Sequence, residues 1–278
     1  MECQLAGYDS KKFTWVAHAR ATIYTRAMLY KRFTITFGSG KTAPALQLPL
    51  ASEPEDLAAL LGLPPCNGTI AVVGGAAKFD APEYQKQRQI VFEIFQKMAA
   101  LAARKNLVFV DGGTPHGVMR LLAQACSGLE TVSPPLVGVV PLGQVRWPGC
   151  PPDMCGDTEL DATHSAFVLV ESDQWGAEAD MLATVAHKLA AGRPTVELLV
   201  NGGDVTRQDV AVFLRRGGNL VVLEGSGRFA DELAAAVRTG HSTDPEMQTF
   251  LSSKQIHVQF INISPAGFVS WLEKLTGW

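Results

Sequence analysis

The sequence predicts an α/β fold, in which a mostly parallel sheet of about seven strands carries helices on both faces. Short runs of Val, Ile and Leu, each the length of a buried strand, alternate with amphipathic stretches from residue 66 onward. Four of these runs stop at neighbouring glycines, where a chain can turn sharply and approach a ligand closely. The four glycine-terminated runs are 69–75, 107–113, 196–203 and 220–227.

The chain is long enough for one large α/β domain with an appendage. It has 278 residues, of which 47% are apolar and 18% charged, and this composition is typical of a folded globular protein. The alternating strand and helix pattern begins near residue 66. We therefore divide the chain into an N-terminal extension that packs on the core, residues 1–65, and an α/β domain, residues 66–278.

The net charge of −3 gives no reason to expect a nucleic acid or a membrane surface as partner. The charge is unevenly distributed, because residues 1–41 contain seven basic and two acidic side chains. We interpret this basic segment as a solvated face docked on an acidic body, and an anionic partner is the alternative. No apolar run approaches the roughly 20 residues of a membrane-spanning helix, so no membrane span is expected.

The five cysteines, an odd number, form no recognisable disulfide framework. Cys150 and Cys155 stand in a loop rich in proline and glycine, and no second pair completes a zinc site. We expect this pair and the other three, Cys3, Cys66 and Cys126, to be reduced thiols in a cytoplasmic protein. No metal site is expected.

Each element follows from a local pattern. Before residue 66, alternating apolar and polar residues predict a strand over 33–37, and a short apolar stretch predicts a helix over 55–61. Apolar runs predict strands over 69–73, 107–110, 136–140, 166–170, 196–200, 219–223 and 257–263. Amphipathic stretches predict helices over 82–104, 117–126, 178–191, 207–216, 229–239, 245–252 and 267–275. Asp80, Pro82 and Glu83 have the spacing of a capping box at the first long helix.

The carboxyl ends of parallel strands meet at one edge of a sheet, where open α/β folds bind their ligands. We expect the four glycine loops to line one crevice there. The fourth loop runs directly into a helix, whose free N–H groups favour a phosphate, so it is the best candidate for the phosphate-binding loop.

Individual side chains have expected roles in this crevice. Lys78 would neutralise a phosphate, Asp111 or Glu224 would accept hydrogen bonds from ribose hydroxyls, and Trp175 would stack on a base. His164 by itself is more typical of a hydrogen-bonded core residue than of a catalyst. The predicted ligand-binding residues are Gly74, Gly75, Ala76, Lys78, Asp111, Gly112, Gly113, Thr114, Gly117, His164, Trp175, Asn201, Gly202, Gly203, Glu224, Gly225, Ser226, Gly227 and Arg228.

Seven segments in this order resemble the SLOG superfamily. They are Val73-Gly-Gly-Ala-Ala-Lys-Phe79, Val110-Asp-Gly-Gly-Thr-x-x-Gly-Val-Met119, Leu136-Val-Gly-Val-Val-Pro141, His164-Ser-x-Phe-Val-Leu-Val170, Trp175-Gly-x-Glu178, Val200-Asn-Gly-Gly203 and Leu223-Glu-Gly-Ser-Gly-Arg-x-Ala-Asp231. The resemblance covers about residues 66–275. It is closest to the ligand-sensing branch, which forms the N-terminal domain of melastatin-type TRP channels and stand-alone prokaryotic proteins.

The resemblance implies a Rossmann-like fold and a nucleotide-derived ligand of the ADP-ribose, cyclic ADP-ribose or NAD-related class. It also suggests a homodimer, and a sensor needs an effector protein that the sequence does not identify. We expect a binding protein without a catalytic cofactor.

An enzyme is the alternative reading. The LOG enzymes of the same superfamily hydrolyse the N-glycosidic bond of nucleoside monophosphates and carry the loop Pro-Gly-Gly-x-Gly-Thr-x-x-Glu. The corresponding segment here is 223–231, in which two glycines are retained and the catalytic Glu position is Asp231. If the protein is such a hydrolase, Asp231 or Glu224 is the candidate catalytic carboxylate. An NAD(P)-dependent oxidoreductase and a scaffold whose glycines only form turns rank lower.

Overall fold

The computed structural model describes residues 30–278. Its main feature is a nine-stranded sheet in the order β1-β2-β8-β5-β4-β3-β9-β10-β11, in which only the β1–β2 pair is antiparallel. Its strands are β1 (Lys31–Thr36), β2 (Thr42–Leu48), β3 (Thr69–Gly74), β4 (Val108–Asp111), β5 (Leu136–Pro141), β8 (Ala166–Val170), β9 (Thr195–Val200), β10 (Asn219–Glu224) and β11 (Ile256–Phe260). Two further short strands, β6 (Val145–Arg146) and β7 (Thr158–Glu159), pair separately. The predicted α/β class is confirmed.

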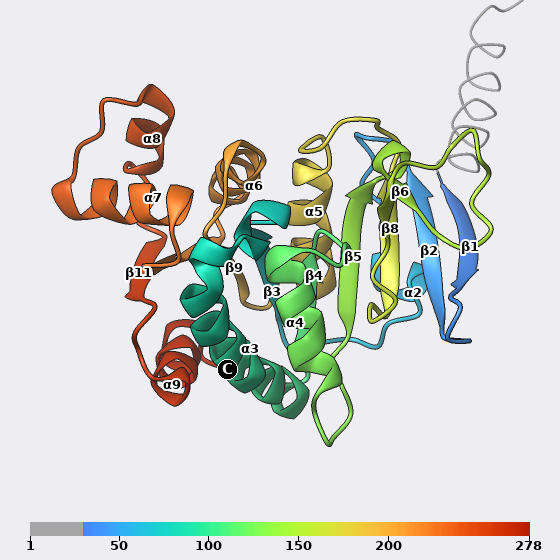
Figure 1. Cartoon of the computed structure of the whole chain (residues 1–278), viewed down its shortest axis with the longest axis horizontal. Coiled ribbons are helices and arrows are strands. Elements are labelled where there is room, and N and C mark those ends of the chain that lie inside the picture. The colour runs from blue at the N-terminus through green and yellow to red at the C-terminus, as the bar shows by residue number, and fades with distance from the viewer. Residues whose placement is uncertain (1–29) are drawn as a thin grey trace, which may run out of the picture.

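Helices cover both faces of this sheet (Figure 1). One apolar cluster joins the sheet to α3 (Gln85–Lys105), α4 (Gly117–Ser127) and α9 (Pro265–Thr276). The other joins it to α2 (Leu57–Leu60), α5 (Ala179–Ala190), α6 (Asp204–Arg215), α7 (Arg228–Thr239) and α8 (Pro245–Phe250). Both faces of the central strands are therefore buried, which explains their nearly continuous apolar sequence. No helix within residues 30–278 has the length and apolarity needed to cross a membrane.

The sheet has two more strands than the seven that were predicted for the domain. Both come from the segment before residue 66, where β1 and β2 form a hairpin and β2 pairs in parallel with β8. The first corresponds to the predicted strand over 33–37. The second has the sequence Thr-Ala-Pro-Ala-Leu-Gln-Leu, and its Pro and Ala have low strand propensity, so no local pattern indicated it.

The predicted capping box at Asp80 is wrong. Pro82 starts a separate short 3₁₀ turn (Pro82–Tyr84), and α3 begins only at Gln85 without a side-chain cap. Ala81, the residue before this proline, is extended, as the ring of a following proline favours, so it cannot be the first helical residue after an N-cap at Asp80. Asp80 instead accepts a hydrogen bond from the backbone N–H of Gly117 at 3.0 Å and pairs with Arg120, so it caps α4.

The expectation of reduced cysteines is also contradicted, because Cys150 and Cys155 form a disulfide. The loop between β6 and β7 turns back on itself and brings their Cα atoms to 6.0 Å, within the range of a disulfide. We had considered a framework of several disulfides and overlooked that one local pair of cysteines can form a disulfide by itself. Cys66 and Cys126 are free and buried, whereas Cys3 and most of the basic segment lie outside the described residues.

Candidate functional site

The site lies where the chain reverses its direction across the sheet. From β3 the chain proceeds to β4 and β5 on one side, and it later returns to place β9 and β10 on the other side of β3. The four strands β4, β3, β9 and β10 are neighbours and parallel, so the glycine loops that follow them leave the sheet along the same edge. A crevice forms at such a switch point because adjacent loops turn to opposite faces.

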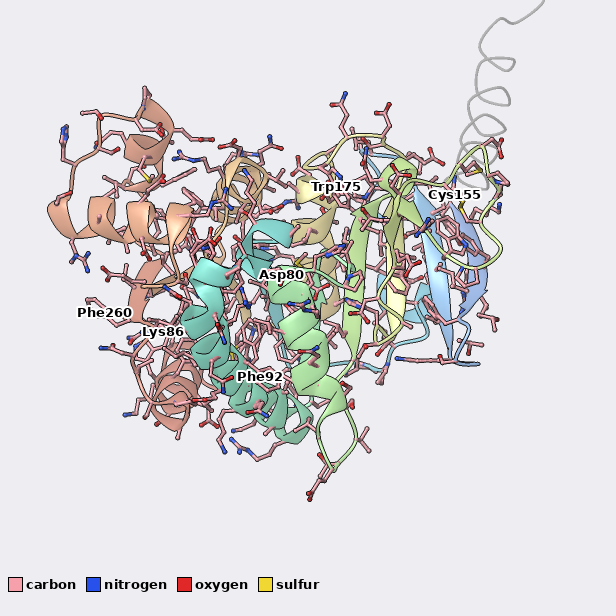
Figure 2. The ribbon with its side chains drawn as sticks, viewed as in Figure 1. Asp80, Lys86, Phe92, Cys155, Trp175 and Phe260 are labelled. Carbon is pink, nitrogen blue, oxygen red and sulfur yellow. A yellow bond between two sulfur atoms is a disulfide. The ribbon has the colours of Figure 1, made fainter. Side chains whose placement is uncertain are left out.

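A cavity of about 510 Å³ opens at this edge. It is bounded by the loops after β3 and β4, the starts of α5 and α6, and the first residue of α7. Trp175 stands at its mouth and is 41% exposed, and Figure 2 shows it at the upper edge of the molecule. The predicted residues that line the cavity are Gly74, Gly75, Ala76, Lys78, Gly112, Thr114, Trp175, Gly203 and Arg228.

Close backbone packing explains two of the predicted glycines. A Cβ on Gly74 would lie 1.9 Å from the carbonyl oxygen of Val200, and a Cβ on Gly117 would lie 1.9 Å from that of Gly75. Both residues also have a positive φ, which favours glycine. Gly74 thus lets the first loop lie against the third, and Gly117 lets α4 lie against the first loop. Gly117 itself does not line the cavity.

Asp111 and His164 form a buried pair beneath the second loop and do not line the cavity. His164 Nε2 lies 2.7 Å from Asp111 Oδ1, which also accepts the backbone N–H of Gly113 at 2.8 Å. Burial by itself lowers the pKa of His164, but the charge of Asp111 and its hydrogen bond raise it overall. The pair therefore fixes the second loop from below, and neither side chain faces a ribose in the cavity.

The third and fourth loops are bound to each other. The backbone N–H of Asn201 donates to Ser226 Oγ at 2.8 Å, and its side-chain amide donates to the Ser226 carbonyl at 2.8 Å. The Ser226 hydroxyl in turn donates to the carbonyl of Leu223 at 2.6 Å. Neither residue lines the cavity, and the same holds for Gly113, Gly202, Gly225 and Gly227.

The two candidate catalytic carboxylates also bind other groups of the protein. Asp231 accepts the backbone N–H of Gly225 at 2.6 Å, and Glu224 forms an ion pair with Arg238. Neither carboxylate lines the cavity. In the fourth loop, only Arg228 lines the cavity. The other residues of this loop mainly bind neighbouring segments of the protein.

The mouth of the cavity carries free donors and two cations. Gly203 begins α6 without a side-chain cap, so the N–H groups of the first turn have no acceptor from a capping side chain. Lys78 is exposed, and the guanidinium of Arg228 stands over Gly203, where a Cβ would lie 2.5 Å from its Nη2 atom. Neither cation forms an ion pair with another residue of the described range 30–278. Asp204, exposed in the first turn of α6, is the acidic side chain at this mouth.

Three buried carboxyl groups that the sequence analysis missed lie at the inner wall. Glu178 and Asp209 line the cavity, and Glu197 stands behind them in the middle of β9. Burial raises the pKa of Glu178 to about 7. Burial, and then the charge of Glu178, raise the pKa of Asp209, while burial and the charge of Asp209 raise that of Glu197. One signal was available, because Glu197 interrupts an otherwise apolar buried strand.

Comparison with solved structures supports the fold. An X-ray structure of the structural-genomics target TM1055 covers 74% of this chain and 99% of its own, with a TM-score of 0.51 and 17% identity. The molybdenum cofactor carrier protein of Chlamydomonas reinhardtii covers 76% and 99% respectively, with a TM-score of 0.49 and 17% identity. The molybdenum cofactor binding protein of Rippkaea orientalis covers 75% and 97%, with a TM-score of 0.48 and 15% identity. At these identities, the first of the three shows a shared fold and nothing more.

Comparison of sequences shows the family. The chain is 27% identical over 209 residues to the transient receptor potential cation channel subfamily M member 2 of Mus musculus, which covers 62% of this chain and 13% of the channel. The chain therefore spans only about an eighth of that relative. The family model described as "SLOG in TRPM, prokaryote" matches residues 67–268, which include all the strands from β3 to β11 and every residue of the cavity. The chain belongs to this prokaryotic SLOG family, which is the branch that the sequence motifs indicated.

Proposed function

We propose that the cavity binds a nucleotide-derived ligand with a diphosphate group, of the ADP-ribose and NAD-related class, and that the chain acts as a sensor of this ligand. The observation that carries the proposal is the mouth of the cavity, where Lys78 and Arg228 have no acidic partner among the described residues. A diphosphate supplies the anionic partner that these two cations lack. Charge-assisted hydrogen bonds to phosphate oxygens are among the stronger polar contacts that proteins make.

The size of the cavity is consistent with this ligand class. Small-molecule sites have volumes of about 300–1,000 Å³, and this one is about 510 Å³. The N–H groups at the start of α6, which have no side-chain cap, add further donors at the cavity. We place the phosphate at the first loop, the start of α6 and Arg228, whereas the sequence suggested the whole fourth loop, of which Arg228 alone lines the cavity. A homodimer, an effector protein and a cytoplasmic location stay predictions.

The hydrolase alternative loses the residues on which it depended. Asp231 and Glu224 hold backbone and ion-pair contacts outside the cavity, so neither is available to a ligand bound there. Incubation with AMP, NAD and ADP-ribose, followed by chromatography, separates a sensor from a hydrolase, because only a hydrolase releases the free base. Release of base that Asp231→Asn abolishes would support the hydrolase.

Titration calorimetry with ADP-ribose tests the binding site. Arg228→Gln and Lys78→Ala each remove one cation from the mouth, and we expect each to weaken binding by about 10- to 100-fold, the worth of a charge-assisted hydrogen bond. Lys86→Ala is the matched control, because Lys86 is an exposed lysine of α3 outside the cavity (Figure 2). Equal affinity in the wild type and in both cavity variants would reject this site.

A further inference from the structure

The cavity has chemically opposite ends. Lys78 and Arg228 stand at the mouth, where the first loop is exposed to solvent. Glu178 and Asp209 are on the inner wall, where their exposed fractions are only 6% and 8%. A ligand that places phosphate at the mouth therefore meets buried carboxyl groups with its other end.

Two of the buried carboxyl groups at this wall, those of Asp209 and Glu197, accept no hydrogen bond from the described chain. Asp209 accepts no hydrogen bond there, and both oxygens of Glu197 are fully buried without a partner. Glu178 uses one oxygen to accept the backbone N–H of Gly176 at 2.7 Å. Buried polar groups are nearly always satisfied in folded proteins, and leaving them unsatisfied costs free energy. Asp209 is not among these fully buried unpartnered groups, because its carboxyl lines the cavity, where a ligand can supply a hydrogen-bond partner.

A metal ion is a poor candidate for this partner. Across residues 30–278, no three His, Cys, Asp or Glu side chains come together in a geometry that could hold one. The nearest charges that raise the pKa of Asp209 and Glu197 are those of other carboxyl groups, and no cation contributes. Since carboxylates in such a cluster repel one another, they do not all ionise together. The wall therefore presents an O–H donor as well as acceptor oxygens.

The surface around the carboxyl groups is apolar and suits a planar ring. Val72, Met119 and Leu182 line the cavity together with Glu178 and Asp209. An apolar slot with a few polar groups that fix orientation is the usual form of a ligand-binding pocket. A nucleobase has this character, with two apolar faces and a polar edge.

We propose that Glu178 and Asp209 form the base-recognition end of the cavity and bind the hydrogen-bonding edge of an adenine-type base. This inference rests on the proposed function, because it places the base of the same diphosphate ligand. The edge of adenine offers an acceptor, N1, beside a donor, the 6-amino group. A protonated carboxyl offers the complementary O–H donor and carbonyl acceptor. Guanine presents two adjacent donors, N1–H and the 2-amino group, and suits an ionised carboxylate instead.

The direction of the pH dependence follows from the charges around this wall. Burial raises the pKa of Glu178 to about 7, and burial with the charge of Glu178 raises that of Asp209. Glu197 of β9 adds a further buried acid behind Asp209, and the other charged or titratable side chains that line the cavity are Lys78, the half-buried His116, Asp204 and Arg228. The acid forms are populated below neutral pH and are lost as the pH rises. Adenine binding should therefore weaken as the pH rises through 7.

Two titrations test the inference. The first compares ADP with GDP at pH 6.0, and we expect ADP to bind at least about tenfold more tightly, as a matched pair of base-edge hydrogen bonds allows. The second follows ADP-ribose from pH 5.5 to 8.5, since its diphosphate does not titrate in this range. We expect its affinity to fall by about tenfold over this interval. Equal affinities for ADP and GDP, or an ADP-ribose affinity independent of pH, would overturn the inference.

Matched variants of one residue identify the group that reads the base. Asp209→Asn keeps a donor and an acceptor but cannot ionise, so it should retain ADP-ribose binding and reduce the fall in affinity with pH to the part that Glu178 contributes. Asp209→Leu should abolish the preference for ADP over GDP. If the Asp209→Leu variant does not fold, the inference is still tested by the pH profile of Asp209→Asn and by the affinities of the wild type for ADP and GDP. Binding of ADP and GDP without discrimination rejects only the inference, whereas failure of ADP, GDP and ADP-ribose to bind rejects the proposed function as well.

Discussion

Replacement of Glu178 by Gln should make the protein more stable at alkaline pH and leave it nearly unchanged in acid. Burial raises the pKa of Glu178 from 4.5 to about 7, so the folded protein retains this proton over an interval in which the unfolded chain has released it. The folded state then binds more protons, and its stability falls as the pH rises from about 4.5 to about 7 and stays lower above. Gln keeps an oxygen for the N–H of Gly176 and does not ionise.

The magnitude of this stability difference follows from the size of the pKa shift of Glu178. At 1.36 kcal/mol for each pKa unit, the buried charge costs the wild type about 3 kcal/mol above pH 7, relative to the variant. For a chain of this length, that free energy corresponds to about 6 °C in the midpoint of thermal unfolding. The difference between variant and wild type should therefore grow by this amount between pH 4.5 and pH 8.5.

The assay is thermal and urea unfolding of both proteins at these two pH values. Glu130→Gln is the control, because Glu130 is an exposed carboxyl in the loop after α4 and its removal should not change the pH dependence. A variant that is destabilised equally at both pH values would refute the reasoning, since it would show that Glu178 is ionised in the folded protein throughout this range.

Two further predictions concern the residues beneath the loops. Asp80→Ala should destabilise the protein by about 1 kcal/mol in urea unfolding, because Gly117 loses its capping acceptor and Arg120 its partner; an unchanged midpoint would show that Asp80 does not cap α4. His164→Leu should cost about 3–5 kcal/mol, because the fully buried Asp111 loses its cation. The raised pKa of His164 means that this loss should be full below pH 6.5 and smaller at alkaline pH, and a loss that grows with pH would contradict the ion pair.

Much of the fold could be predicted from sequence because its signals are local. The apolar runs ended at turn-forming glycines. The bounds of each predicted strand from β3 to β10 agree with those in the structure to within a residue or two. β2 was missed because its Pro and Ala have low strand propensity, and it is a strand because it pairs with β1 and with the distant β8. The capping box at Asp80 failed because the real partner of this carboxylate is the start of α4, which the local pattern could not show.

The candidate site was predictable only in part. The glycine pattern correctly located the edge of the sheet, since it reports where backbones turn and pack closely. It did not distinguish loops that face a cavity from loops that bind one another, and Ser226 and Asn201 belong to the second kind. The acids of the inner wall depend on distances between α5, β9 and α6, which no single segment of sequence contains. Only Glu197, a charge within an apolar strand, carried a local signal.

The decisive measurement is a crystal structure of the protein with ADP-ribose. We expect electron density for the diphosphate between Lys78 and Arg228, with the adenine edge within hydrogen-bond distance of Asp209. Adenine stacked at the mouth on Trp175, with the inner wall empty, would contradict the base assignment. A ligand bound elsewhere on the molecule, with the cavity empty, would contradict the proposed function itself.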